Sequence, residues 1–395
     1  MRPPILLRGA KQLLTLRGPS SARRGAALQD LGIIEDGSVL IRDGLIASIG
    51  PTRRIENLKA ARGAQEIPIE GRIVTPGFID AGLHLSLRRS ETSSQFKRIA
   101  DFYEDSLNLM RLCLQHGTIT ADVKGSADDQ KFHSDIAVFR KLAKIGSTPV
   151  RMMRTWRVNF GVGRTVSDDL VPTLQTLLRR KFIHSICVAP RGVHDFDIEA
   201  IVAAQAAGLP LKMLWSGASQ TVLAELLHQL NPHSVCAQHF DSLAPEALAN
   251  SSAIAVLAAG KQLFEGPICT SGRSLIDAGA AVALSSGYQS VATGNFSMQM
   301  AIALAVARLG LTPEEAWSAA TINAAYAAGC GDITGSLEIG KQADLLVLNV
   351  ADYRDIPRQF GINHVAMVFR DGVMVLNRTR WRSPAEQQPA RRVRS

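Results

Sequence analysis

The sequence predicts an α/β protein: a TIM (β/α)8 barrel with a small β-sandwich domain formed from both termini. In the middle of the chain, apolar runs of strand length alternate with helical patterns, and about eight such units close a barrel. Hairpin patterns occur near both ends. Two terminal segments can form one small domain, because the termini of compact domains often lie close together.

The chain is long and apolar enough for this architecture. It has 395 residues, of which 46% are hydrophobic and 20% are charged, so it can bury a large core and does not resemble a disordered chain. We predict that residues 1–70 and 336–380 form the sandwich, that 71–335 form the barrel, and that 381–395 form a basic tail.

Two hairpins and one further strand predict the sandwich. One hairpin spans residues 38–50 around Asp43-Gly44, and the other spans 364–375 around Asp371-Gly372. Asp-Gly is a frequent two-residue hairpin turn, because these residues adopt a positive φ more readily than most. The further strand covers residues 344–348.

The barrel strands are predicted where apolar runs are nearly continuous, as in parallel sheets that are buried on both faces. These runs are residues 73–85, 119–123, 150–155, 186–189, 211–214, 234–238, 254–257 and 281–285. Helical patterns between them include residues 101–116, 170–180, 197–207 and 220–229. A later helix begins at Thr312-Pro313, where Thr312 and Glu315 form a capping-box pattern. In such a barrel the reacting groups lie at the carboxyl ends of the strands.

Composition favours a cytoplasmic protein. The five cysteines show no Cys-x-x-Cys pair, which is typical of reduced thiols. We find neither a secretory signal nor an apolar run long enough for a membrane span, so no membrane association is expected. The net charge of +9 comes largely from the two ends of the chain. Without an aromatic-interleaved basic stripe, nucleic-acid binding is not expected.

The first barrel strand ends in half of a metal-binding pattern. Alternate strand residues point to the same face, so a His-x-His sequence places two imidazoles side by side. In this chain His84 supplies the second imidazole, and Gly82 stands in place of the first. Glycine offers a metal no donor atom.

Several segments resemble the amidohydrolase superfamily and, within it, the imidazolonepropionases, which open a cyclic amide. The similar segments are residues 71–80, 209–212, 311–316, 321–325 and 335–345. The resemblance extends over about residues 5–376. It implies the barrel-and-sandwich fold, a hydrolase that acts on carbon–nitrogen bonds other than peptide bonds in cyclic amides, and a divalent metal held by four residues.

The four metal-ligand positions of that family are largely replaced here. By the resemblance, three histidines and one aspartate correspond to Gly82, His84, Leu214 and Gly287. A catalytic zinc site normally uses three protein ligands and a water. Recruiting His239, another histidine that the resemblance retains, would give only two. We therefore predict a protein that has lost its metal and its hydrolase activity and that needs no cofactor.

Two hypotheses about function remain open. In the leading one, the protein is a small-molecule-binding or partner subunit, either as a homodimer, which is common in the family, or in a heteromer with an active paralogue. In the alternative, it is an active hydrolase on a cyclic amide, with Zn or Fe at a rearranged site. The candidate catalytic residues are then His84, Lys124 and His239.

Four residues are candidates for ligand binding. Lys124, which the resemblance also retains, follows the second barrel strand and could bind an anion or a carboxylate, or could pair with Asp80 instead. Trp156 and Arg157 could supply a stacking or anion-binding surface. Tyr288 ends a segment of small residues that is either an adapted binding loop or a filling for the space of the lost metal.

Overall fold

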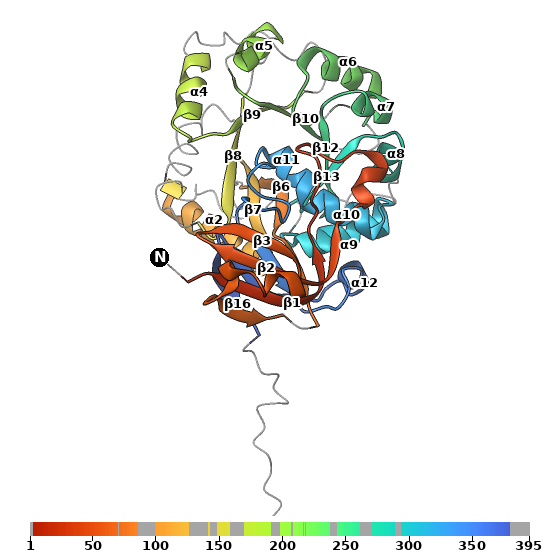
Figure 1. Cartoon of the computed structure of the whole chain (residues 1–395). Coiled ribbons are helices and arrows are strands. Elements are labelled where there is room, and N and C mark those ends of the chain that lie inside the picture. Colours follow the sequence, from red (N-terminus) through yellow and green to blue (C-terminus); the bar gives the residue numbers. More distant parts are fainter. Residues whose placement is uncertain are drawn as a thin grey trace, which may run out of the picture.

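The computed structural model has two eight-stranded sheets, one of which is surrounded by helices (Figure 1). This arrangement confirms the predicted α/β fold class. The structure describes residues 3–69, 71–85, 99–125, 141–142, 148–158, 170–190, 198–206, 208–215, 217, 219–237, 243–260, 271–288 and 294–379. Many of the remaining residues follow the carboxyl ends of barrel strands.

The sheet surrounded by helices is a nearly closed barrel of eight parallel strands. Each strand pairs with the next along the chain, and the last strand contacts the first. The strands are β6 (Phe78–His84), β7 (Thr118–Gly125), β8 (Arg151–Arg157), β9 (Ser185–Val188), β10 (Leu211–Trp215), β11 (Ser234–Ala237), β12 (Ile254–Ala258) and β13 (Ala281–Ser285). All eight overlap the strands predicted from apolar runs.

Helices cover the outside of the barrel (Figure 1). They are α2 (Ile99–Gln115), α4 (Leu170–Arg179), α5 (Ile198–Ala206), α6 (Gln220–Leu230), α7 (Pro245–Ala249), α8 (Ser271–Asp277), α9 (Met298–Arg308) and α10 (Pro313–Ala320). Helix α10 begins with the predicted capping box. Glu315 N donates to the Thr312 hydroxyl over 3.3 Å, and Thr312 N donates to the Glu315 carboxylate over 2.8 Å.

Helix α11 (Ile322–Ala328) closes the amino end of the barrel. Its small alanine side chains pack against the first inward-facing residues of three strands, which are Ile79, Ile254 and Ala281. Small side chains let the helix approach the strands closely. The opposite end of the barrel, at the carboxyl ends of the strands, is called the mouth below.

Strands from both termini form one continuous mixed sheet in the order β16–β15–β14–β5–β1–β2–β3, with β4 paired to β1. They are β1 (Ile5–Leu14), β2 (Ile33–Arg42), β3 (Leu45–Pro51), β4 (Gln65–Pro68), β5 (Ile73–Pro76), β14 (Leu345–Leu348), β15 (Val365–Arg370) and β16 (Val373–Asn377). Residues from both ends of the sheet, such as Val39 and Phe369, share one core. The predicted terminal domain is therefore a single sheet whose two halves pack together. The remaining described elements are short helices, namely η1 (Gly25–Gln29), α1 (Thr52–Ile55), η2 (Lys59–Ala61) and α12 (Asp355–Arg358).

The two predicted hairpin turns are confirmed, and they touch each other. Asp43 and Gly44 have φ of 51° and 82°, and Asp371 and Gly372 have φ of 50° and 70°. Two consecutive positive φ angles match the twist of a two-residue hairpin. A Cβ on Gly372 would lie 2.8 Å from the Gly44 Cα, so the contact between the turns needs glycine.

The strand predicted over residues 73–85 is two strands in different sheets. Strand β5 belongs to the terminal sheet, and β6 is the first barrel strand. Between them, Gly77 passes so close to Ile119 that a Cβ would lie 2.3 Å from the Ile119 Cδ1. A continuous apolar run could not reveal this crossing, because both strands are buried.

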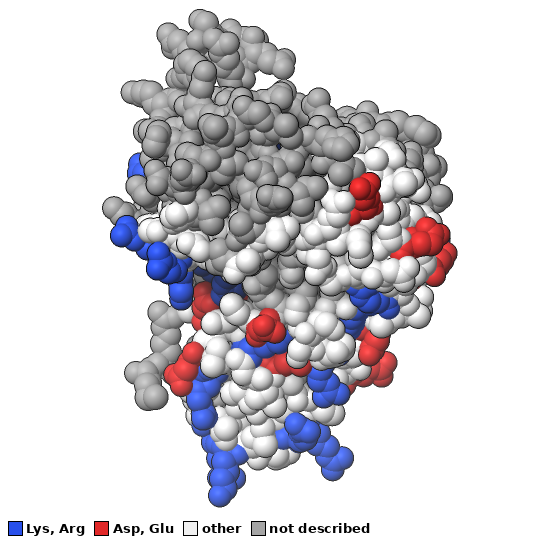
Figure 2. Space-filling view, turned by 90° about the horizontal axis from the view of Figure 1, so that it is seen from above, with Lys and Arg blue, Asp and Glu red and all other residues white. Residues whose placement is uncertain are grey.

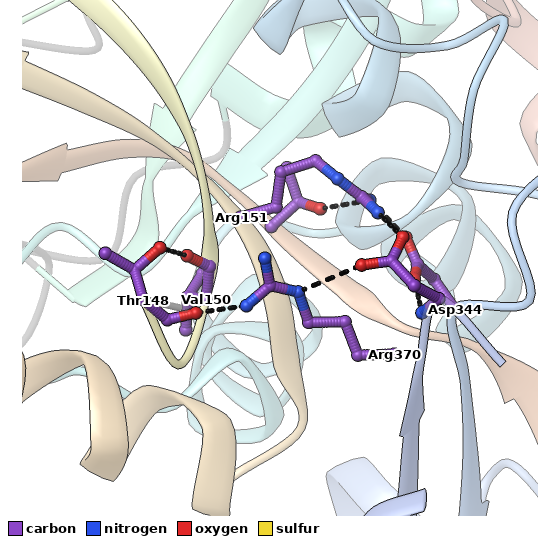
Figure 3. A network of polar contacts seen from close by, with 7 residues as sticks. Thr148, Val150, Arg151, Asp344 and Arg370 are labelled. Atoms are coloured by element: carbon purple, nitrogen blue, oxygen red, sulfur yellow. Dashed lines mark hydrogen bonds and ion pairs between the residues drawn. The ribbon is translucent and has the colours of Figure 1, made fainter. Parts of the chain in front are cut away.

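A buried ion pair joins the barrel to the terminal sheet (Figure 3). Asp344, just before β14, has a side chain that is 0% exposed, and it pairs with Arg151 at the start of β8. The same guanidinium pairs with Asp371, and Asp371 N donates to Asp344 over 2.9 Å. Burial alone would lower the pKa of Arg151, but the carboxylates of Asp344 and Asp371 raise it. Nearby, Arg370 donates to the Thr148 carbonyl.

Three further expectations concern the chain as a whole. Cys113, Cys187, Cys236 and Cys330 are buried and free, as predicted, and Cys269 lies outside the described residues. No described helix has the length and apolar character that crossing a membrane requires. On the face shown in Figure 2, basic and acidic side chains are interspersed over the described surface.

The buried pair at the joint gives a stability prediction. Replacing Asp344 by asparagine leaves the Arg151 guanidinium without its buried counter-charge, and we expect the free energy of unfolding to fall by about 3 kcal/mol. The matched control is Asp371→Asn, because the Asp371 side chain is 46% exposed and such a pair contributes roughly 0–1 kcal/mol. Urea unfolding followed by circular dichroism measures both. Equal losses in the two variants would contradict a special role for Asp344.

Candidate functional site

Residues from the first, second and last barrel strands meet at the mouth. His84 on β6 is paired in register with Lys124 on β7. Gly82 lies between Lys124 and Ser285 of β13. A Cβ built on Gly82 would be 3.5 Å from Lys124 Nζ and 3.4 Å from Ser285 Oγ. Gly82, where the sequence analysis expected a histidine by resemblance, is therefore bordered by an ammonium and a hydroxyl.

Lys124 carries a buried positive charge at this point. The residue is only 6% exposed, and no hydrogen bond or ion pair joins its ammonium to the part of the chain that the structure describes. Burial would lower the pKa of Lys124, but Cys236, Asp122, Cys187 and Asp80 raise it above its ordinary value. The ammonium therefore stays charged at neutral pH.

The Asp80 carboxylate is held by the backbone and by the segment after β13. Its Oδ1 accepts from Gly82 N and from Ser286 N, both over 3.1 Å, and its Oδ2 accepts from the Ser286 hydroxyl. Burial raises the pKa of Asp80, and these three donors act against that rise. The sequence left open an ion pair between Asp80 and Lys124, and the structure does not form it.

The segment that follows β13 is folded tightly against the first strand. Gly287 has a φ of 74°, a left-handed conformation that favours glycine over other residues. Tyr288 N donates to the Ser286 hydroxyl over 3.2 Å, and the Tyr288 carbonyl accepts from His84 N over 3.4 Å. These hydrogen bonds hold the segment against the end of β6.

The residues at the mouth do not fit a divalent metal ion. Only His84 among the four family positions carries a donor atom, because Gly82 and Gly287 have no side chain and Leu214 offers only carbon. Among the residues that the structure describes, no three histidine, cysteine, aspartate or glutamate side chains are grouped so that they could hold a metal. The nearby Lys124 ammonium would repel a cation, and glycine at position 287 supplies no negative charge to offset it.

A second buried ion pair crosses the barrel interior below the mouth. Lys212 Nζ on β10 lies 2.9 Å from Asp122 Oδ2 on β7, and the two side chains are 3% and 1% exposed. Lys212 also donates to the Ala328 carbonyl of α11 over 3.4 Å. The Thr155 hydroxyl donates to Asp122 and lies 2.8 Å from the Ser185 hydroxyl. We did not predict this network, although single charged residues within apolar strands were a signal for it.

The remaining candidates are placed differently. The Thr155 side chain faces the barrel interior, so its neighbour Trp156 faces outward, where it is 1% exposed within the largest core cluster. This position favours a packing role for Trp156 over ligand stacking. Arg157 lies on the same side of β8 as Thr155 and is exposed at the strand end. Tyr288 is half-buried beside His84, and His239 lies outside the described residues.

Comparisons with known proteins agree with this architecture. The family model described as "Amidohydrolase family" matches residues 182–375. The imidazolonepropionase of Geobacillus kaustophilus (strain HTA426) is 30% identical over 421 residues, which cover 95% of this chain and 98% of that protein. The imidazolonepropionase of Geobacillus thermodenitrificans (strain NG80-2) is 31% identical over 422 residues, with the same coverage. The crystal structure of A. niger ochratoxinase has a TM-score of 0.72 at 16% identity and covers 95% of this chain and 96% of its own, which is a likeness in fold.

The interior ion pair can be tested by removing one or both charges. We expect Lys212→Met to lower the free energy of unfolding by about 3–5 kcal/mol, because Asp122 is left buried without its counter-charge. The double variant Lys212→Met, Asp122→Leu removes both charges and should recover most of that loss. Urea unfolding of the three proteins forms the comparison. A single variant as stable as the unmodified protein would show that the pair is not formed.

Proposed function

Because this chain belongs to the amidohydrolase family, we propose that it is a member that works without a metal ion and no longer hydrolyses cyclic amides. In this proposal the barrel mouth is kept as a binding site for a small molecule. The observation that carries the proposal is the position of the Lys124 ammonium beside Gly82, at the place where the family resemblance puts the first metal-binding histidine.

The chemistry of amide hydrolysis explains why that observation matters. A metal ion lowers the pKa of its bound water to about 7 and polarises the carbonyl group that the water attacks. A base must then take the proton of that water. Glycine at position 287 offers no carboxylate for this step, and its left-handed backbone supports a turn that is built for glycine. The residue at position 287 thus offers neither a metal ligand nor a carboxylate base, which supports the proposal.

The polar groups that remain support a binding role. Binding sites in barrel folds commonly combine an apolar lining with a few placed polar groups. The mouth has a charged ammonium, a serine hydroxyl and the imidazole of His84 on neighbouring strands, together with the half-buried Leu214. This set can bind and orient a polar small molecule without any metal.

The alternative function is an active hydrolase with a rearranged site. The observation that favours it is the register of β6 and β7, which places His84 opposite Lys124. A neutral imidazole can act as a general base. In that case, His84→Ala should abolish turnover while it leaves the melting temperature nearly unchanged.

Metal analysis combined with an activity screen tests the proposal. The full chain is purified without a metal-chelating tag, dialysed, and examined by elemental analysis for zinc, iron and manganese. The imidazolonepropionase of Geobacillus kaustophilus, prepared in the same way, is the control for both measurements. We expect far less than one metal ion per chain and no turnover of imidazolones, hydantoins or lactams.

Each other outcome has a definite meaning. One tightly bound metal ion per chain would overturn the proposal, with or without cyclic-amide hydrolysis. Turnover without metal that disappears in His84→Ala would favour the alternative hydrolase.

A further inference from the structure

We propose that the mouth binds the carboxylate of a small aliphatic molecule, held by the Lys124 ammonium and the Ser285 hydroxyl in the space beside Gly82. This inference rests on the proposed function, because a metal ion at the mouth would compete for the same space. It adds the chemical class of the ligand and the two groups that recognise it.

The first argument is the charge on Lys124. Burying an ionised group without a partner costs several kcal/mol, so buried charges in proteins are paired. The nearby carboxylates are engaged elsewhere, since Asp122 pairs with Lys212 and Asp80 accepts three hydrogen bonds from the backbone and Ser286. Among the described residues, none contacts the ammonium with a negative charge. An anionic ligand would supply that charge.

The second argument is independent of the first and concerns Ser285. Its hydroxyl is buried and has no hydrogen-bond partner within the described part of the chain, whereas the large majority of buried side-chain polar atoms in proteins have one. The hydroxyl and the ammonium lie close together, at 3.4 Å and 3.5 Å from the Cβ position of Gly82. A hydroxyl donor and an ammonium this close together can bind the two oxygens of one carboxylate.

The charge of Lys124 and the apolar residues nearby indicate the chemical class of the ligand. One ammonium and one hydroxyl match a single negative charge with two oxygens, whereas a phosphate group carries a charge of about −1.5 to −2 and three acceptor oxygens. Next to these groups, Leu214 is paired in register with Cys236, and Cys236 is one of the groups that act on Lys124. Leu214 and the residues packed around it, among them Ala81 and Val256, give this part of the barrel an apolar lining. The part of the ligand beyond its carboxylate should therefore be aliphatic.

Thermal unfolding and calorimetry of the metal-free full chain test this inference. The probes are acetate, propionate and butyrate, compared with acetamide, propionamide and butyramide at constant ionic strength. Ligands that bind only the folded state raise Tm in a saturable way. We expect each carboxylate to raise Tm and the matching neutral amide to leave it unchanged, and we expect inorganic phosphate to bind more weakly than butyrate.

Variants assign the effect to the two groups. Lys124→Met should weaken butyrate binding by about 10- to 100-fold, and Ser285→Ala by about 2- to 10-fold, which are the losses expected for a charged and a neutral hydrogen bond. Lys59→Met is the matched control, because Lys59 is exposed in the terminal domain, and it should bind as the unmodified protein does. Gly82→Asp places a carboxylate next to the ammonium. This variant should have a raised Tm without ligand and should no longer respond to butyrate.

The outcomes separate this inference from the proposed function. If the metal-free protein does not respond to any of the carboxylates, or if Lys124→Met binds butyrate as tightly as the unmodified protein, the carboxylate site is wrong and the metal-independent function still stands. Phosphate binding that is tighter than butyrate binding would also overturn the choice of ligand. Stoichiometric metal in the purified protein would instead overturn the proposed function itself.

Discussion

A charged group inside a protein needs a counter-charge or strong hydrogen bonds, because the interior solvates it far less well than water. The barrel of this protein contains buried charges at three levels along its axis. At the base, Arg151 pairs with Asp344, and in the middle Lys212 pairs with Asp122. At the mouth, Lys124 has no such partner among the described residues. The first two pairs stabilise the structure, and the third charge marks the place where a ligand is needed.

The contacts that stabilise the barrel lie at its base and in its middle, so residues at the mouth can differ while the fold stays the same. At the base, the alanines of α11 pack against the strands, and Arg151 pairs with Asp344 of the terminal sheet. In the middle, the ion pair between Asp122 and Lys212 connects two strands across the interior. In barrel enzymes stability depends mainly on such regions, whereas chemistry depends on the carboxyl ends of the strands. Gly82, near the end of β6, and Gly287, after β13, lie away from these regions, so the residues there can differ without weakening the packing below them.

The sequence predicted the elements of the fold well because their signals are local. Apolar runs marked the barrel strands, Asp43-Gly44 and Asp371-Gly372 marked the hairpins, and the pattern at Thr312 marked the start of a helix. The division between β5 and β6 was missed, because two adjacent buried strands have the same apolar pattern as one long strand. The partner of Lys212 was missed as well. Asp122 is 90 residues away in the sequence, and no periodicity identifies which charges meet across a barrel.

The candidate site was only partly predictable for the same reason. The sequence placed Gly82 and His84 at the end of the first barrel strand and Lys124 after the second. It did not show that Asp80 accepts from Ser286 and that Lys124 forms no ion pair with the described residues. That difference decides the interpretation of the lysine. If Lys124 were paired with Asp80, the two residues would form another internal ion pair, and no unpaired charge would be left at the mouth for a ligand. Since Asp80 is held by other donors, the charge on Lys124 is available to a ligand, and the protein itself supplies a cation at the mouth.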